Sequence, residues 1–297
     1  MSRSTEDTKE SVIYVVATPI GNLDDISLRA VRILKNVDLI AAEDTRRARL
    51  LLQQIGREKA EIISYYDQVE KEKSVQLIAR LQAEVLSLAL ISDAGTPCIS
   101  DPGYRLIREA RRAGIKVHPI PGASALTALV SASGLPSDRV LFIGFLPNKR
   151  SALVKEIKSW AQLEASIVFY EAPRRLKQTL AAIEEFYPYA ELVIGRELTK
   201  LHEEIISTDI KGAQMWCHDH EFLKGEASIM LRIGEPPEGT AQSVEDLRSQ
   251  LGREASDLFQ QGSSLKDLLQ LFKDRGLSRG ELYQLLLKAK ETDREED

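Results

Sequence analysis

Short apolar runs alternate with stretches of helical periodicity along the first half of the chain. The runs are Val12–Val16, Val37–Ala41, Ile62–Tyr65, Leu86–Ile91 and Val117–Ile120. Short apolar runs bounded by turn residues predict buried strands. Between the first two runs, apolar residues recur at helical spacing from Ile26 to Leu34, which predicts a helix. Strands alternating with helices predict βαβ units around a parallel sheet.

The second half also mixes strands and helices, after a proline- and glycine-punctuated segment from Gly134 to Asn148. Its predicted strands are Val140–Phe145, Ser166–Tyr170, Leu192–Gly195, Glu203–Ser207 and Ala227–Ile233. Helical stretches separate the first three strands, whereas the pattern predicts a loop between the last two. A loop connection suits antiparallel neighbours, so we expect a mixed sheet.

The C-terminal segment has a different pattern. Residues 235–242 hold two prolines and a glycine without periodicity, which predicts a linker. Beyond it, Leu265–Phe272 and Leu282–Leu287 predict two amphipathic helices in a small helix-turn-helix-like unit, with Gly276 in the turn. The expected organisation is a disordered tail (1–10), an α/β domain (11–134), a second α/β domain (135–234), a linker (235–242) and a helical extension (243–297).

Composition narrows the class of protein. The chain has 297 residues, 43% hydrophobic and 29% charged, which is the balance of a soluble globular protein. No stretch reaches the ~18 apolar residues of a membrane span, so no membrane partner is expected. Cys98 and Cys217 match no disulfide or zinc spacing, which favours a cytoplasmic protein. The formal net charge is −5, so RNA would have to be bound through local basic clusters and shape.

The segment at residues 91–103 carries the most informative chemistry. It follows a predicted strand and ends in Asp101 and Pro102, which resemble a helix N-cap followed by proline at the first helical position. Ligands of open α/β sheets bind at the carboxyl ends of the strands. Asp93 can accept hydrogen bonds there, and Gly95 lets a flat ligand approach the backbone. The alternative is an ordinary strand-to-helix loop.

Two more strand-to-helix connections are rich in small, turn-forming residues: Pro119–Ala128 and Thr18–Asp25. Small residues in a first helical turn leave backbone N–H groups free to face a ligand, although close helix packing explains them as well. Neither G-x-G-x-x-G nor G-K-[ST] is present, so a dinucleotide fingerprint and a P-loop are unsupported.

Five motifs, in this order, resemble those of known methyltransferases. Val16–Asp25, Ala41–Arg46 and Asp93–Gly103 resemble the tetrapyrrole methylase superfamily, and Phe169–Arg175 and Arg196–Glu203 narrow the match to the ribosomal RNA small subunit methyltransferase I family. That family 2′-O-methylates a cytidine of 16S rRNA. The resemblance covers roughly Ile13 to Gly234, and the helical tail also fits it.

The resemblance implies two α/β domains of tetrapyrrole-methylase type, a parallel sheet and then a mixed sheet, followed by the helical extension. It implies S-adenosyl-L-methionine as the methyl donor between the domains, 16S rRNA in the small ribosomal subunit as the substrate, and a homodimer. Carried over by position, the donor contacts are Pro19, Asp93, Gly95, Thr96, Ile99, Ser124, Ala125, Tyr170 and Ala227.

The acceptor chemistry also calls for a base, because a ribose hydroxyl is a poor nucleophile until it is deprotonated. The polar candidates in the matched motifs are Glu171, Glu197, Lys200 and Asp44, with His202 and Arg46 beside them. The motifs do not say which of them is the base.

Basic clusters are the candidates for RNA contact: Arg46, Arg47, Lys149, Arg150, Arg174 and Arg175. Arg174 and Arg175 begin a predicted helix, where a cation is locally unfavourable, and this points to a phosphate-facing role. A solvated surface is the alternative.

Two other functions stay open. A precorrin- or uroporphyrinogen-type tetrapyrrole methyltransferase would share the superfamily, but Phe169–Arg175, Arg196–Glu203 and the helical tail argue against it. A non-catalytic RNA-binding assembly protein would not need the loop at 93–103. Cys217-His218-Asp219-His220 offers metal-ligand types, yet adjacent residues cannot all face one ion, so we expect a surface loop over Ile210–Lys224 and no metal.

Overall fold

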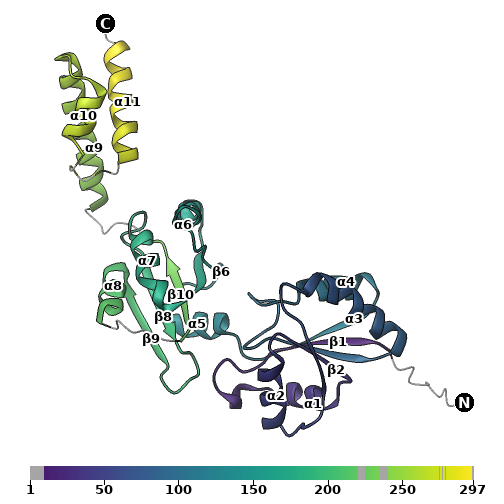
Figure 1. Cartoon of the computed structure of the whole chain (residues 1–297). Helices are drawn as coiled ribbons and strands as arrows, with labels where there is room; N and C mark the ends of the chain where they lie inside the picture. The colour runs from purple at the N-terminus through teal and green to yellow at the C-terminus, as the bar shows by residue number, and fades with distance from the viewer. Residues whose placement is uncertain are drawn as a thin grey trace, which may run out of the picture. The chain divides into compact units, whose positions relative to one another are not determined.

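The computed structural model describes residues 10–219, 225–234, 240–273, 275, 277 and 279–295. The chain divides into two compact units, one ending at Gly234 and the other beginning at Glu235. The first unit holds both sheets (Figure 1). Of the predicted tail, only Glu10 is among the described residues, and the predicted linker is outside them up to residue 239.

The first sheet has five parallel strands in the order β3-β2-β4-β1-β5. Each strand forms on one of the apolar runs: β1 (Val12–Val16), β2 (Leu39–Ala42), β3 (Glu61–Ser64), β4 (Ser87–Ile91) and β5 (Lys116–Ile120). The predicted parallel sheet is therefore confirmed.

Helices cover both faces of this sheet (Figure 1). One face packs against α1 (Leu28–Asn36) and α2 (Thr45–Gln54), and the other against α3 (Glu70–Glu84) and α4 (Tyr104–Arg112). Strands buried on both faces need apolar side chains at successive positions, which is why they read as continuous apolar runs.

The start of α4 differs from the prediction. The helix begins at Tyr104, so Asp101 is not its N-cap. The side chain that fills this role is Glu70, whose carboxylate accepts the backbone N–H groups of Gly103 at 2.9 Å and Arg105 at 3.0 Å. An acceptor from a distant helix satisfies the free N–H groups of the first turn. The Asp101 side chain is thereby released from the capping role that local sequence suggested.

The second sheet is mixed, as predicted, with the order β6-β7-β10-β8-β9. The pair β6–β7 is parallel and the other three pairs are antiparallel. The strands are β6 (Val140–Phe145), β7 (Ser166–Glu171), β8 (Glu191–Arg196), β9 (Glu204–Asp209) and β10 (Ala227–Arg232). They follow the predicted ranges closely.

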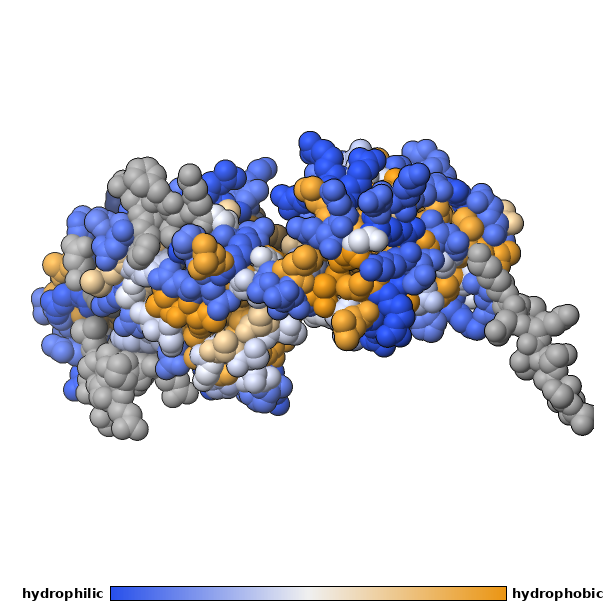
Figure 2. All heavy atoms as spheres, turned by 90° about the horizontal axis from the view of Figure 1, so that it is seen from below, coloured by the Kyte–Doolittle hydropathy of each residue, from blue (hydrophilic) through white to orange (hydrophobic). Residues whose placement is uncertain are grey.

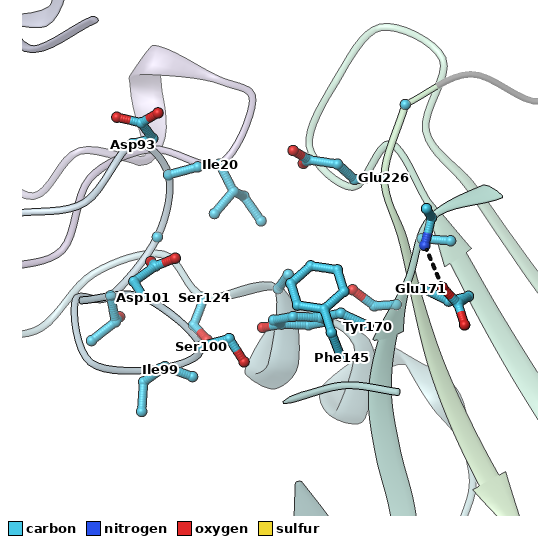
Figure 3. Close-up of a pocket in the computed structure, with 18 of the residues that line it drawn as sticks. Ile20, Asp93, Ile99, Ser100, Asp101, Ser124, Phe145, Tyr170, Glu171 and Glu226 are labelled. Carbon is cyan, nitrogen blue, oxygen red and sulfur yellow. Dashed lines mark hydrogen bonds between the residues drawn. The ribbon is translucent and has the colours of Figure 1, made fainter. Parts of the chain in front are cut away.

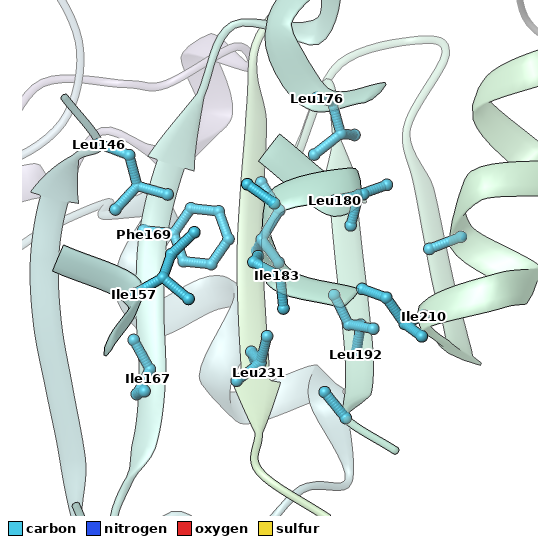
Figure 4. Packing of buried hydrophobic residues seen from close by; sticks show 14 of the residues in the cluster. Leu146, Ile157, Ile167, Phe169, Leu176, Leu180, Ile183, Leu192, Ile210 and Leu231 are labelled. Carbon is cyan, nitrogen blue, oxygen red and sulfur yellow. The ribbon is translucent and has the colours of Figure 1, made fainter. Parts of the chain in front are cut away.

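One face of the second sheet is covered by α6 (Arg150–Lys158), α7 (Pro173–Glu184) and α8 (Ile210–Asp219). Figure 4 shows the side chains of α7 and the strands meeting in this core, with Phe169 among them. The opposite face packs against α5 (Ala125–Ser133), whose Leu129 lies with Val168 and Val193. Although α5 precedes the domain boundary predicted at residue 134, it packs on the second sheet.

The helix α8 replaces the loop predicted between β9 and β10. Ile210, Ala213 and Cys217 are buried on one side of it, at the three- and four-residue spacing of a helical face. The predicted surface loop is therefore wrong for residues 210–219. Residues 220–224, which include His220, lie outside the described part. Over the residues that the structure describes, no three His, Cys, Asp or Glu side chains group to hold a metal ion.

The second unit contains three described helices: α9 (Thr240–Gln260), α10 (Leu265–Leu271) and α11 (Arg279–Glu295). They share a core of their own that includes Leu251, Phe272 and Leu286. The predicted helical extension is confirmed. The linker predicted up to residue 242 is too long, because α9 already begins at Thr240 and continues through alanine and glutamine, which favour helix. The predicted turn glycine, Gly276, is outside the described residues.

Several large apolar side chains remain at the surface of the first unit. Leu201 is 93% and Leu28 84% exposed. Figure 2 shows apolar side chains gathered between polar ones on one face of the molecule. Within the described residues, no helix is both long and apolar enough to cross a bilayer.

Candidate active site

A pocket of about 360 Å³ lies where the carboxyl ends of the first sheet's strands face the second sheet. The loop after β4 forms one side of it. The start of α5 and the ends of β6 and β7 form the other, together with the beginning of β10. This is the edge at which open α/β sheets bind ligands, and the volume lies in the range of small-molecule sites.

Eight of the nine predicted donor contacts line this one pocket: Asp93, Gly95, Thr96, Ile99, Ser124, Ala125, Tyr170 and Ala227. Pro19, the ninth, lines an adjoining hollow of about 540 Å³. The two cavities share Ile20, Arg47 and Asp93. Residues that are far apart in the sequence are thus brought to one place.

The strand-end loops are tied to one another by backbone hydrogen bonds. The Thr18 N–H donates to the Gly95 carbonyl at 2.8 Å, and the Gly95 N–H donates back to Thr18 at 3.0 Å. The Thr96 hydroxyl donates to the Ala123 carbonyl at 3.1 Å. Gly95 has φ +82°, and a Cβ there would lie 3.3 Å from Ile20 Cγ2. A side chain at this position would therefore have to displace Ile20 by a few tenths of an ångström.

Asp93 connects the pocket to the start of α2. Its Oδ1 accepts the Asp44 N–H at 2.9 Å, and its Oδ2 lies 3.5 Å from the Arg47 guanidinium. The side chain keeps 27% exposure, so it still faces the pocket. A carboxylate held in this way can accept hydrogen bonds from a ligand amino or hydroxyl group.

Asp101 also lines the pocket, although the sequence suggested only a helix-cap role for this residue. Burial raises the pKa of Asp101 to about 6; a Ser92 hydrogen bond opposes this shift, and the charges of Glu43, Asp93 and Asp67 add to it. The Asp-Pro-Gly sequence resembled a helix cap so closely that it hid this role. The sequence feature that could have indicated this role is a second carboxylate, besides Asp93, in the loop at residues 91–103.

Aromatic side chains form the wall that the second sheet contributes. The Tyr170 hydroxyl accepts the Leu126 N–H at 3.1 Å, which joins β7 to the first turn of α5. Burial raises the pKa of Tyr170, so its phenol stays neutral. Phe145 packs edge-on against Tyr170 at 5.6 Å between ring centroids, yet it remains 61% exposed. Figure 3 shows both rings across the pocket from Asp101.

The Glu171 carboxylate, a predicted catalytic group, is turned away from the pocket (Figure 3). It accepts the Ala172 N–H at 2.9 Å and the Thr179 hydroxyl at 2.7 Å. The Arg175 guanidinium lies 3.4 Å away, and Glu171 itself is only 1% exposed. Since its oxygens are occupied by the protein, Glu171 supports the start of α7 and is not the base.

Glu197 and Lys200 form an ion pair, with 2.9 Å between Glu197 Oε1 and Lys200 Nζ. Burial alone would raise the pKa of Glu197, but the bonds from Lys200 and the Glu226 N–H outweigh it and the pKa is lowered. Burial alone would lower the pKa of Lys200, but its carboxylate partners raise it. Both groups therefore stay charged, and neither is suited to take up a proton near neutral pH.

Asp44 caps α2 by accepting the Arg46 N–H at 2.8 Å. Hydrogen bonds from the Arg46 side chain and backbone lower the pKa of Asp44 to about 2. Such a carboxylate holds a proton too weakly to act as a general base. His202 is exposed at the surface and does not line the pocket.

Some of the predicted RNA-contacting cations are exposed, and others form ion pairs or line a cavity. Arg174 and Lys149 are exposed. Arg150 pairs with Glu185, and Arg46, 85% exposed, pairs with Asp44. Arg47 lines both cavities.

Arg175 differs from its neighbour Arg174. Its guanidinium donates to the carbonyls of Leu146 at 3.2 Å and Pro147 at 2.9 Å, and to the Asn148 side chain. These bonds fasten the segment after β6 to the start of α7. We therefore assign Arg175 to the fold and do not retain it as an RNA contact.

Comparison with known proteins gives the family. A profile of the tetrapyrrole (corrin/porphyrin) methylases matches residues 12–214, which is more than half of the chain. The chain belongs to the tetrapyrrole methylase family. The resemblance drawn from the five motifs is confirmed, and so is the fold class that it implied.

Curated relatives named ribosomal RNA small subunit methyltransferase I align over nearly the whole length. The relative from Pasteurella multocida is 40% identical over 276 residues, 92% of this chain and 95% of its own. The relative from Synechocystis is 41% identical over 278 residues, 93% of this chain and 97% of its own. Each alignment therefore covers more than nine-tenths of both chains.

Solved structures show the same fold at low identity. Uroporphyrin-III-C-methyltransferase from Thermus thermophilus has a TM-score of 0.52 at 20% identity, covering 75% of this chain and 94% of its own. Diphthine synthase has a TM-score of 0.56 at 17% identity, covering 74% and 89%. These proteins are named for different reactions, so the fold does not fix the acceptor.

Proposed function

We propose that this protein transfers the methyl group of S-adenosyl-L-methionine to the ribose 2′-hydroxyl of a cytidine in 16S rRNA. The substrate is the small ribosomal subunit, and the enzyme acts in the cytoplasm as a homodimer. The observation that carries the proposal is the pocket lined by eight of the nine predicted donor contacts, in a chain about 40% identical to relatives named for small-subunit rRNA methylation.

The residues present fit S-adenosyl-L-methionine. The Asp93 carboxylate can accept from an amino group, and Gly95 lines the pocket with backbone that carries no side chain, against which a flat group can lie. The Tyr170 ring and the nearby carboxylates favour a cationic centre. When bound, this donor supplies the reactive methyl carbon.

The protein's own part is to orient the acceptor and to remove its proton. Holding donor and acceptor in line supplies much of the rate of a group transfer. Exposed cations near the pocket, Arg46, Arg47 and Arg174 among them, are suited to RNA phosphates.

The test is a map of 2′-O-methyl groups on 16S rRNA from cells with and without the gene, followed by methyl transfer in vitro to purified small subunits. We expect one cytidine to lose its methyl group in the deletion strain and to regain it on complementation. An unchanged map would refute the proposal. Binding and methylation of a tetrapyrrole in its place would establish the alternative within the family.

A further inference from the structure

The loop that carries Asp101 has an unusual backbone. Cys98 and Ser100 both have left-handed conformations, with φ of 70° and 65°, although neither is glycine. Such conformations are costly and persist where the surrounding structure enforces them, often at functional sites. This backbone path presents Asp101 to the pocket and leaves the capping of α4 to Glu70.

The same loop meets the second sheet beside Phe145. Gly144 has φ +76°, and a Cβ there would lie 2.8 Å from Ser100 Oγ, so the two segments are in close contact. The next residue, Phe145, packs only its edge on Tyr170 and leaves most of its ring exposed. Figure 3 shows Ser100, Asp101 and Phe145 around one part of the pocket.

The other carboxylates that line the pocket have protein partners. Both Asp93 oxygens face donors, the Asp44 N–H and Arg47. The Glu171 oxygens are occupied on the far side of β7. Glu226, with 75% side-chain exposure, lies 3.6 Å from Lys200.

Glu43 is the fifth carboxyl of the pocket. It lies on the α2 side of the pocket, where burial and the charge of Asp93 raise its pKa. Asp101 is the remaining lining carboxyl, and it faces the exposed Phe145 ring across the pocket (Figure 3).

We propose that Asp101 and Phe145 form the subsite for the acceptor nucleotide: Phe145 stacks on the nucleobase, and the Asp101 carboxylate accepts the proton of the ribose hydroxyl. This inference rests on the proposed function and names the residues that receive its substrate. An exposed aromatic ring suits any base face, because every base presents a π surface. A carboxylate within reach of the hydroxyl suits general base catalysis.

The step balances as a simple displacement. The O–H bond of the acceptor breaks and its proton moves to Asp101, while the hydroxyl oxygen forms a bond to the methyl carbon. The bond between that carbon and the donor sulfur breaks, and its electron pair stays on sulfur. The products are the 2′-O-methyl ribose, a neutral thioether and protonated Asp101, which returns its proton to solvent.

The electrostatics of the loop agree with this role. Desolvation raises the pKa of Asp101 to about 6, and Glu43, Asp93 and Asp67 are the acidic groups that add to the shift. At neutral pH most Asp101 is ionised, and it binds a proton more tightly than an ordinary aspartate does. Turnover should therefore fall as the pH drops through this range.

The first test is Asp101→Asn, which keeps the size of the side chain and removes its basicity. Asp138→Asn, at an exposed aspartate remote from the pocket lining, is the matched control. We expect kcat on small subunits to fall by about 10²–10⁴-fold, the acid limb of the kcat–pH profile near pH 6 to disappear, and the calorimetric Kd for S-adenosyl-L-methionine to stay within a few-fold. Wild-type kcat, or a reduced kcat with the same acid limb, would overturn the assignment.

The second test compares Phe145→Ala with Phe145→Tyr. Loss of stacking should raise the KM for small subunits by about 10- to 100-fold, and the tyrosine variant should restore it. A KM that is unchanged in Phe145→Ala refutes the stacking role. A wild-type protein that transfers no methyl group to subunits would refute the proposed function. An active wild-type protein whose Asp101 and Phe145 variants are equally active would refute only the proposed subsite.

Discussion

Gly95 shows how one residue without a side chain shapes the pocket. Its backbone is left-handed, and it forms two hydrogen bonds with Thr18 across the junction of two strand-end loops. Gly114 has a nearly identical φ of +73°, but a Cβ there meets nothing within 4 Å. Alanine substitutions at these two glycines therefore separate the free-energy cost of a left-handed backbone from the effect of a side chain in the pocket.

We expect Gly95→Ala and Gly114→Ala to lose similar stability, about 1–2 kcal/mol each from the left-handed backbone. Only Gly95→Ala should also weaken the binding of S-adenosyl-L-methionine, because its new methyl group presses on Ile20. Thermal unfolding and calorimetric titration measure the two effects. Equal Kd values in the two variants would contradict a ligand-facing role for Gly95.

The two carboxylate oxygens of Asp93 have different partners. One holds the start of α2 through the Asp44 N–H, and the other faces Arg47 and the pocket. Asp93→Ala should raise the Kd for S-adenosyl-L-methionine by one to two decades, because a hydrogen bond to a charged group contributes about 1.5–3 kcal/mol.

Asp93→Asn is the matched variant, since its amide oxygen can still accept from Asp44. It should keep the unfolding temperature of the wild type while binding the donor more weakly. Calorimetry on the folded variants decides the point. An Asp93→Ala protein that folds and binds normally would remove Asp93 from the site.

At the scale of single elements, the start of α7 places two arginines in different roles. Arg175 is 22% exposed and fastens Leu146 and Pro147, whereas Arg174 projects to the surface. A structural and an exposed cation at adjacent positions form a natural comparison.

Arg174→Ala should weaken binding to small subunits and make the salt dependence shallower by about one unit of slope, because one phosphate contact releases about one counterion. Arg175→Ala should lower the unfolding temperature and leave the slope unchanged. Binding measured over a series of salt concentrations, beside thermal unfolding, separates the two. Equal slopes for Arg174→Ala and wild type would make Arg174 a solvated surface residue.

At the scale of the whole molecule, the net charge and the division into two compact units indicate which form of the RNA the protein recognises. A net charge of −5 gives little general attraction to long RNA, so recognition has to depend on local cations and on the shape of an ordered target. The second unit has its own core, built on Leu251, Phe272 and Leu286. Two linked binding units gain affinity only when the target presents both sites at a suitable distance.

We therefore expect methyl transfer to assembled small subunits to be far faster than transfer to protein-free 16S rRNA. A chain ending at Glu238 should lose activity on subunits and keep its affinity for S-adenosyl-L-methionine, because the donor pocket lies entirely in the first unit. Incorporation of labelled methyl groups into both substrates measures this. Equal rates on the two substrates, or full activity of the shortened chain, would contradict the expectation.

The sequence by itself determined the strands, the order of the two sheets and the ligand loops. Buried parallel strands must be apolar at successive positions, and loops that approach one another closely must be small, so both leave a local pattern. The five motifs also carried the family, and eight of the nine donor contacts predicted from the resemblance line one pocket.

Only the tertiary structure decided which polar side chains remain available for chemistry. Asp101 resembled a helix cap until Glu70, from another helix, proved to fill that position. Glu171 and Arg175 resembled site residues until their partners in the fold were seen. The physical reason is that a hydrogen bond depends on where its partner lies in space, and these partners come from distant parts of the chain. Local pattern therefore predicts the elements, and long-range packing selects the reactive groups.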